Sequence, residues 1–167
     1  NMPTFSKFKM RTKLILIVLV PLLGLLYFAA SNTLEKSAIS HEMSKLESLV
    51  EVSVEVGALA HELQKERGMT SGFLNSHGTR FAAELAAQRA VTDKKAGDLK
   101  QVLAAFDGDQ FVPSLKNSLD EVLRDLGAIA AIRNAASAQT IPAQDAFGYY
   151  TRTIGKFLNI PAQASTL

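Results

Sequence analysis

The sequence predicts an all-α protein, an up-down-up-down four-helix bundle joined to an N-terminal transmembrane helix. Its 167 residues include no Cys, no Trp and five Pro, a composition that favours helices without disulfides or thiolate metal sites. Apolar side chains recur at steps of three and four along most of the chain, and one long apolar run stands near the N-terminus. These observations predict one membrane segment followed by one helical domain.

The apolar run from Leu14 to Ala30 is the expected membrane span. Its 17 residues would extend about 25 Å as a helix, at the short end of a bilayer crossing. Four cations and no acidic residue precede it, which predicts a cytoplasmic N-terminus. We therefore expect a basic cytoplasmic segment at 1–13, a transmembrane helix at 14–31 and a periplasmic helical sensor domain at 32–167.

A cleaved signal peptide is the alternative interpretation of the run, because Ala29, Ala30 and Ser31 resemble a weak cleavage site. The run is longer than the usual apolar core of a signal peptide, and a helical pattern continues past it without a break. These features favour an uncleaved anchor in the bacterial inner membrane. In both interpretations the remainder of the chain is extracytoplasmic.

The charge of the remaining chain argues against a nucleic-acid partner. Of the 18 Lys and Arg residues, four precede the apolar run, which leaves 14 basic against 16 acidic residues and a net charge of −2 after residue 30. No basic face is present, so we expect no nucleic acid as a partner.

Four helices are predicted after the span, each with one apolar stripe. They cover 32–74, 80–106, 113–138 and a segment that begins at Pro142, separated by turns at 75–79, 107–109 and 139–141. The residues expected to face inward are Leu46, Leu49, Val50, Val56, Ala60 and Leu63 on the first helix, Phe81, Leu85, Gln88, Thr92, Leu99, Val102 and Phe106 on the second, Leu115, Leu119, Val122, Leu126 and Ile129 on the third, and Phe147, Tyr150, Ile154 and Leu158 on the fourth.

An arginine occupies an apolar position of the first of these helices. Arg67 follows Leu63 by four residues and continues the stripe through Ala60 and Val56. A guanidinium facing a core is costly unless a carboxylate or another anion meets it. Gly68 and a second glycine four residues later leave space beside it. The pattern predicts a small-anion pocket inside the bundle.

Other polar residues are expected in the same layer as Arg67. Folding the first two helices back on the turn near Gly78 sets Arg67 level with Gln88, and the third and fourth helices bring Arg133 and Tyr150 to the same end. The planar donor fork of arginine suits planar oxyanions such as nitrate, nitrite or a carboxylate. The candidate ligand-binding residues are Arg67, Gln88, Thr70, Ser71, Arg133 and Tyr150.

Each of these residues also has a purely structural interpretation. Arg67 would equally pair with an internal carboxylate, or lie at the edge of its stripe and extend outward. Arg133 becomes peripheral if its stripe is drawn through Leu123 and Ala130. The Gly68-x-x-x-Gly72 spacing would also serve close helix packing without any ligand.

Catalysis is not expected. His61 and Glu62 resemble the start of a zinc-protease motif, but Lys65 stands where the second His is needed. The three His residues are too scattered to imply a metal site, and no nucleophile-base arrangement or phosphate loop is visible. We expect neither a metal nor a cofactor.

Several of these segments resemble the nitrate- and nitrite-sensing (NIT) domain of bacterial receptors. The similarity covers about residues 50–160, and its most specific part is the ordered pair of motifs Gln-x-Glu-Arg-Gly and Gln-Arg-x-x-Thr-Asp. The matching segments are 63–68, 70–74, 81–85, 88–93, 126–133 and 150–154.

The resemblance implies an all-helical module in which the arginine of the Glu-Arg-Gly motif, here Arg67, binds nitrate or nitrite. Proteins with this domain include bacterial membrane receptors, namely methyl-accepting chemotaxis proteins, histidine kinases and cyclic-dinucleotide enzymes. Some soluble transcription antiterminators also contain it. The family domain has a second helical half with further arginines, followed in receptors by another membrane helix and a cytoplasmic signalling module. These parts would lie beyond Leu167, so we expect the site to be completed by them or by a partner chain.

The leading hypothesis is a periplasmic sensor region of a transmembrane receptor, a homodimer that binds nitrate or nitrite. A sensor for another small anion, such as a carboxylate, is one alternative. A membrane-anchored helical dimerisation or spacer module without a small ligand is the other.

Overall fold

The computed structural model describes residues 10–105 and 113–164, with the side chains of 31–42 and 161–164 left out of the description. The chain divides into two compact units, Asn1–Lys45 and Leu46–Leu167. The described residues contain five helices: α1 (Met10–Asn75), α2 (Ala82–Ala105), α3 (Pro113–Leu126), α4 (Ile129–Ser137) and α5 (Ala143–Ala164). The all-α class predicted from the sequence is confirmed, and no strand occurs in the part of the chain that the structure covers.

The first unit contains the apolar segment expected to span a membrane. From Met10 to Ala30 the chain is helical, and this stretch is long and apolar enough to cross a bilayer. Its large apolar side chains, from Leu14 at 58% to Phe28 at 65%, are exposed. Pro21 lies inside the helix without ending it. The basic residues Lys7 and Lys9 lie outside the described residues.

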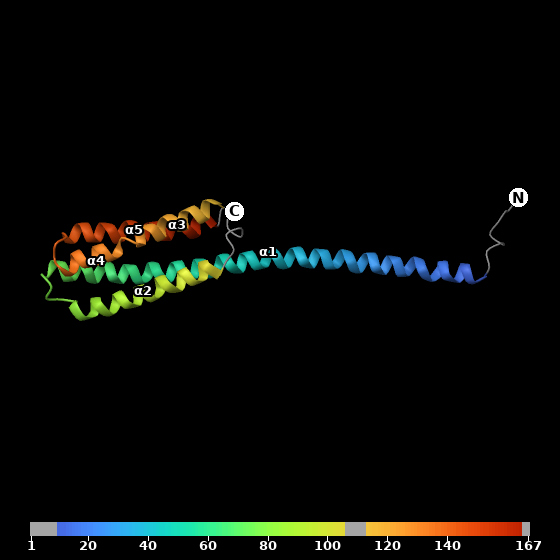
Figure 1. The fold of residues 1–167 in the computed structure, drawn as a ribbon, viewed down its shortest axis with the longest axis horizontal. Coiled ribbons are helices and arrows are strands. Elements are labelled where there is room, and N and C mark those ends of the chain that lie inside the picture. Colours follow the sequence, from blue (N-terminus) through green and yellow to red (C-terminus); the bar gives the residue numbers. More distant parts are fainter. Residues whose placement is uncertain (1–9, 106–112, 165–167) are drawn as a thin grey trace. The chain divides into compact units, whose positions relative to one another are not determined.

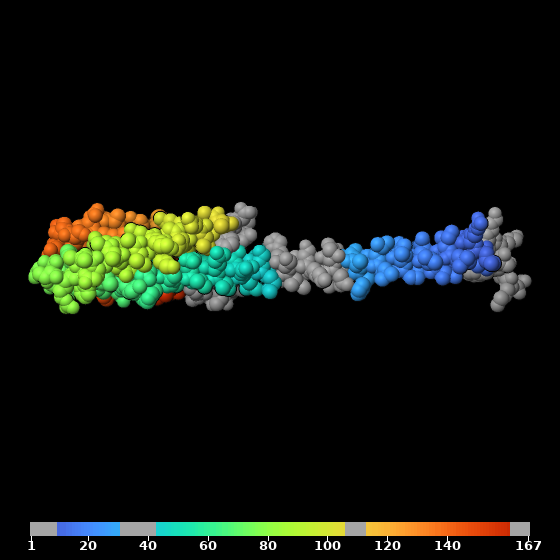
Figure 2. All heavy atoms as spheres, turned by 90° about the horizontal axis from the view of Figure 1, so that it is seen from below, coloured from blue at the N-terminus to red at the C-terminus, as the bar shows by residue number. Residues whose placement is uncertain are grey.

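The second unit is an antiparallel bundle in which α1, α2, α3 with α4, and α5 alternate in direction (Figure 1). Figure 2 views this bundle from the side on which α2 lies, in yellow-green. The up-down-up-down arrangement therefore agrees with the prediction, with α3 and α4 together occupying the third path.

The predicted third helix, 113–138, is divided in two at Gly127. The amide of Gly127 donates to the carbonyls of both Leu123 (3.2 Å) and Arg124 (3.1 Å), and the amide of Ala128 donates to Asp125. This tightened turn ends α3. A Cβ on Gly127 would lie 3.1 Å from the Arg124 carbonyl oxygen, so the turn favours a residue without one. The sequence signal was a glycine inside a helical pattern, which alone does not distinguish a break from a tolerated glycine.

The apolar core follows a period of three and four residues on α1. Val52, Val56, Leu59 and Leu63 are all at most 2% exposed. The predicted inward positions are confirmed on α2 at Leu85, Gln88, Thr92 and Leu99, on α3 at Leu115, Leu119, Val122 and Leu126, and on α4 at Ile129. Phe106 lies outside the described residues.

Four inward predictions are wrong. Leu46 and Val50 on α1 are 58% and 61% exposed, and Phe147 and Leu158 on α5 are 43% and 51% exposed. The cause is a small error of register: a stripe drawn one residue away from the true core line drifts to the surface over a few turns. On α5 the buried line runs instead through Ala146, Tyr149, Tyr150, Thr153, Ile154, Phe157 and Ile160.

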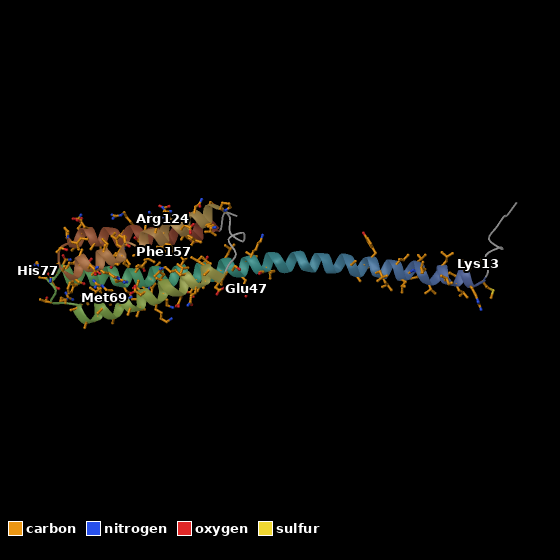
Figure 3. All side chains as sticks on the ribbon, viewed as in Figure 1. Lys13, Glu47, Met69, His77, Arg124 and Phe157 are labelled. Atoms are coloured by element: carbon orange, nitrogen blue, oxygen red, sulfur yellow. The ribbon has the colours of Figure 1, made fainter. Side chains whose placement is uncertain are left out.

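Two similar turns close the same end of the bundle, the end that His77 marks in Figure 3. After α1, His77 adopts a φ of 52° and the amide of Gly78 donates to Phe73 O at 2.8 Å. After α4, Gln139 adopts a φ of 55° and the amide of Thr140 donates to Ala135 O at 2.9 Å. Both are Schellman ends, whose left-handed residue is most often glycine.

The left-handed His77 provides a stability test. His77→Gly should raise the free energy of unfolding by about 0.5–1 kcal/mol, because the left-handed strain of a residue with a Cβ exceeds the entropy cost of glycine. Urea unfolding of the purified chain in detergent, followed by helical circular dichroism, measures the change. His77→Ala is the control, since it removes the imidazole but keeps the Cβ. A gain of equal size in both variants would contradict the backbone explanation.

Candidate functional site

A buried carboxylate lies at the centre of the polar layer. Glu66 is 0% exposed and continues the buried line of α1 through Leu63 toward Thr70. The prediction placed Arg67 at this position, and that prediction is wrong by one residue. Because a helix turns by about 100° per residue, the shift moves the arginine to the edge of the buried face.

Glu66 is paired with Arg133 of α4 in a two-point ion pair. Arg133 Nε donates to Glu66 Oε1 at 2.7 Å, and its terminal Nη2 donates to Oε2 at 2.9 Å. Tyr150 of α5 donates its hydroxyl to Oε1 at 2.7 Å. The carboxylate therefore joins three helices, α1, α4 and α5, through charge-assisted hydrogen bonds.

A second carboxylate holds the other side of Arg133. Arg133 Nη1 donates to Asp93 Oδ1 of α2 at 2.6 Å, and the Arg133 side chain is only 12% exposed. The guanidinium thus has a carboxylate on both sides, and its Nη2 also donates to the Arg89 carbonyl at 3.4 Å. The prediction that Arg133 and Tyr150 share one layer is supported by the geometry, but a protein carboxylate fills the expected anion position.

The pKa shifts of this cluster keep Glu66 and Arg133 ionised and Tyr150 protonated. Burial acts to raise the pKa of Glu66, but the hydrogen bonds from Arg133 and Tyr150 outweigh it and hold the pKa below its ordinary value. Burial lowers the pKa of Arg133, and its two carboxylate partners reverse the effect and raise it. Burial and the neighbouring Glu66 charge raise the pKa of Tyr150, so its hydroxyl stays a donor.

Gln88 is buried, and its side-chain amide is hydrogen-bonded to a neighbouring carboxylate. Its amide Nε2 donates to Glu62 Oε2 at 2.7 Å and approaches the Glu62 carbonyl at 3.2 Å. Thr92 in turn donates its hydroxyl to the Gln88 carbonyl at 3.0 Å. Gln88 therefore connects α2 to Glu62 of α1, and Thr92 is hydrogen-bonded to Gln88 within α2.

Arg67 lies at the opposite edge of α1, against α5. Its Nη1 donates to Thr151 Oγ1 at 3.2 Å, and its guanidinium carbon lies 4.7 Å from the centre of the Phe147 ring. Arg67 is half-buried, and no carboxylate among the described residues lies within ion-pair distance of it. The aromatic ring stabilises the cation without neutralising it.

The remaining predicted ligands, Ser71 and Thr70, lie on the next turn of α1. Ser71, one turn after Arg67 on the same side of α1, is half-buried. Thr70 lies one turn after Glu66 and is 1% exposed, and its hydroxyl has no hydrogen-bond partner in the described part of the chain. The structure therefore separates the six predicted residues into an internal group, Gln88, Arg133, Tyr150 and Thr70, and an edge group, Arg67 and Ser71.

Glu66 and Asp93 are the site residues that the sequence analysis missed. The signal for Glu66 was present, because Val52, Val56, Leu59, Leu63, Glu66 and Thr70 alternate at steps of four and three. The signal for Asp93 was its place in the Gln-Arg-x-x-Thr-Asp motif. Among the described residues, no group of three His, Asp or Glu side chains could hold a metal ion.

The fold and this layer define a class of protein, an all-helical bundle with a paired ionic layer inside and an unpaired arginine at its edge. Residues 58–167 match the family described as nitrate and nitrite sensing. This match covers more than half of the chain, so the chain belongs to the nitrate- and nitrite-sensing (NIT) family.

Two relatives agree with this assignment. The nitrate regulatory protein of Klebsiella oxytoca is 30% identical over 139 residues, which are 82% of this chain and 33% of that protein. The structure of the NasR transcription antiterminator is similar with a TM-score of 0.68 and 28% identity, over 81% of this chain and 36% of that one. The chain thus spans about a third of the length of each relative.

A double-mutant cycle tests the ionic layer. Glu66→Leu should lower the free energy of unfolding by about 3 kcal/mol, because it leaves the buried side of Arg133 without its anion. Arg133→Leu should cost at least as much, since Glu66 is fully buried. The double variant should lose about 2 kcal/mol less than the sum of the two single losses, measured by urea unfolding. Additive losses would show that the two side chains are not coupled.

Acidification should weaken the bundle through Glu66. A carboxyl whose folded-state pKa is lowered stabilises the fold above its unfolded pKa of about 4.3, and this contribution is lost as the pH falls through the folded value. The free energy of unfolding, followed from pH 7 down to pH 2, should fall less steeply with pH in Glu66→Gln than in the wild type. Tyr150→Phe, which removes one donor and keeps the carboxylate, should give an intermediate slope. Identical slopes in all three proteins would exclude Glu66 as the titrating group.

Proposed function

We propose that this chain is the extracytoplasmic ligand-binding region of a bacterial transmembrane receptor and that it senses nitrate or nitrite through Arg67. In this proposal Met10–Ala30 spans the inner membrane and the bundle lies in the periplasm. The role is binding alone and requires no covalent chemistry. Family membership and the apolar segment at the N-terminus support it.

One observation carries the choice of Arg67 as the ligand-binding residue. Of the two arginines expected in the layer, Arg133 is paired with the carboxylates of Glu66 and Asp93, whereas among the described residues Arg67 meets only a hydroxyl and an aromatic ring. A planar guanidinium with free donors matches a planar oxyanion in two-point contact. Thr151, already within hydrogen-bond distance of Arg67, supplies a hydroxyl donor for the same anion.

The neighbouring ionic layer supplies the response to binding. Glu66 and Arg67 are adjacent on α1, so a displacement of the helix at Arg67 also displaces Glu66. An anion held by Arg67 against α5 would favour one packing of α1 relative to α5, and the Glu66 pair couples that packing to α4. A ligand shifts such an equilibrium only by its difference in affinity for the two packings. No larger rearrangement is needed.

Calorimetric titration of nitrate into the purified full chain in detergent tests the site. Arg67→Ala should weaken nitrate binding at least tenfold, about 1.4 kcal/mol, because the charged donor fork is removed. Arg124→Ala is the matched control, since Arg124 is an exposed arginine on α3 (Figure 3) and should leave the affinity unchanged. Equal heats from the wild type and Arg67→Ala would remove Arg67 from the site.

Anion selectivity separates the sensor hypotheses. Nitrite should compete with nitrate, formate should reveal any carboxylate preference, and chloride should compete weakly because it lacks the planar acceptor geometry. A ligand that binds only the folded chain must raise its melting temperature. If no anion raises it at millimolar concentration, the chain is a helical spacer or dimerisation module instead.

A further inference from the structure

A cleft of about 280 Å³ opens between α2 and the place where α3 gives way to α4. Its walls come from α2, α3, the turn at Gly127 and the first residue of α4, and none of the described residues of α1 or α5 lines it. Small-molecule sites commonly hold about 300–1,000 Å³, so this cleft suits a compound at the small end of that range. Arg67 lies against α5 instead. The cleft is therefore separate from the proposed nitrate site.

Two glycines keep the cleft unfilled. Gly97 of α2 is exposed, and a Cβ placed on it would meet no atom within 4 Å. Gly127, which ends the tightened turn after α3, lines the cleft without a side chain, and Ala96 of α2 contributes only a methyl group. Packed helices normally fill the space between them with side chains. A gap that small residues hold open on both sides leaves room for a ligand.

The wall of the cleft that faces α2 is apolar. Leu126 and Ile129 are 6% and 9% exposed, and Leu123 is half-buried beside them. Thr92 also lines the cleft, but its hydroxyl donates to the Gln88 carbonyl of its own helix at 3.0 Å. The body of an occupant would therefore gain apolar contact more than hydrogen bonds.

Two charged residues line the cleft, seven positions apart on α2 and thus about 10 Å apart along its axis. Asp93 is already bound, because it accepts a hydrogen bond from Arg133 Nη1 at 2.6 Å. Lys100 has no ion-pair partner among the described residues, whereas the other two lysines of α2 both pair with Asp98. The charge that remains uncompensated in the cleft is therefore positive, and it lies at the end away from Asp93.

We propose that this cleft binds a small organic carboxylate with a compact apolar body, of the class of the aromatic carboxylic acids. The carboxylate pairs with Lys100 through a charge-assisted hydrogen bond, and the apolar body lies against Leu126 and Ile129. The reverse orientation is disfavoured, because it would set the carboxylate of the ligand beside that of Asp93. A cationic ligand would meet Lys100, and its attraction to Asp93 would have to compete with Arg133.

Fluorine NMR of 4-fluorobenzoate tests whether the cleft is the binding site, with the full chain in lipid nanodiscs and empty nanodiscs as the blank. The wild type should broaden the fluorine resonance, and a titration gives the Kd. Gly97→Leu should raise the Kd at least tenfold, because the new side chain fills the cleft without a clash. Equal broadening by Gly97→Leu and the wild type, or none by the wild type, would overturn the proposal.

Gly57→Leu is the matched control for this substitution. Gly57 is also an exposed helical glycine at which a Cβ would meet no atom within 4 Å, but it belongs to α1 and does not line the cleft. Both variants exchange glycine for a good helix former, so circular dichroism should show full helicity in both. Only Gly97→Leu should lose 4-fluorobenzoate, and an equal loss in Gly57→Leu would contradict a local effect on the cleft.

A second substitution tests the charge. Lys100→Met keeps most of the side-chain volume and removes the ammonium group, so it should raise the Kd of 4-fluorobenzoate several-fold, a modest factor because an exposed ion pair is screened by water. Lys116→Met, at an exposed lysine of α3 that does not line the cleft, should leave the Kd unchanged. The neutral 4-fluorobenzamide should bind the wild type and Lys100→Met equally. Unchanged 4-fluorobenzoate binding by Lys100→Met would overturn the choice of a carboxylate.

Arg67→Ala distinguishes the cleft from the proposed nitrate site. This variant should bind 4-fluorobenzoate as tightly as the wild type, and Gly97→Leu should bind nitrate as tightly as the wild type. Loss of 4-fluorobenzoate in Arg67→Ala would place the carboxylate at Arg67 and overturn the proposal. Because the two ligands respond to different variants, failure of the cleft is distinct from failure of the nitrate site.

Discussion

The packing of this bundle depends on one buried carboxylate, that of Glu66. A charge with no exposed surface is tolerated in a protein interior only when its partners replace the lost water, and here Arg133 and Tyr150 do so with three hydrogen bonds of 2.9 Å or less. Those partners come from α4 and α5, and Arg133 reaches α2 through Asp93. An apolar core would tolerate small rotations of these helices. The two-point geometry between Glu66 and Arg133 permits only one alignment, so the layer sets the register of the bundle.

The break between α3 and α4 makes this layer possible. Arg133 is six residues beyond Gly127, where the tightened turn ends one helix and redirects the next. Arg89 of α2 further holds α4, donating to Ser137 Oγ at 2.8 Å and to the Arg133 carbonyl. The last turn of a helix favours cations, so Arg89 stabilises the end of α4 as well as its position. The break in the third path is thus the feature that positions Arg133.

The sequence predicted the class of fold, the four paths and the end of the bundle where the polar layer lies, because these depend on the apolar period and on turn residues. The sequence prediction was wrong where a shift of one residue along the helix changes which side chain is buried. Glu66 and Arg67 are neighbours, and a stripe drawn at 3.6 residues per turn selects the arginine, whereas the observed 3.5-residue line selects the glutamate. Likewise, the left-handed residues of the two Schellman ends are His77 and Gln139, neither of them a glycine, because the Schellman hydrogen bonds compensate the strain. Such choices depend on tertiary contacts that a single sequence does not display.

The adjacency of Glu66 and Arg67 joins the two chemical roles of the layer. One charge faces the interior and is neutralised by the protein, and the next faces the edge and is not. Neutralising both internally would leave no attraction for a ligand, and leaving both open would give a bundle with a buried unpaired charge. Because Glu66 faces the interior and Arg67 faces the edge, both outcomes are avoided. It also means that the proposed anion site at Arg67 and the ion pair of Glu66 with Arg133 belong to the same turn of α1.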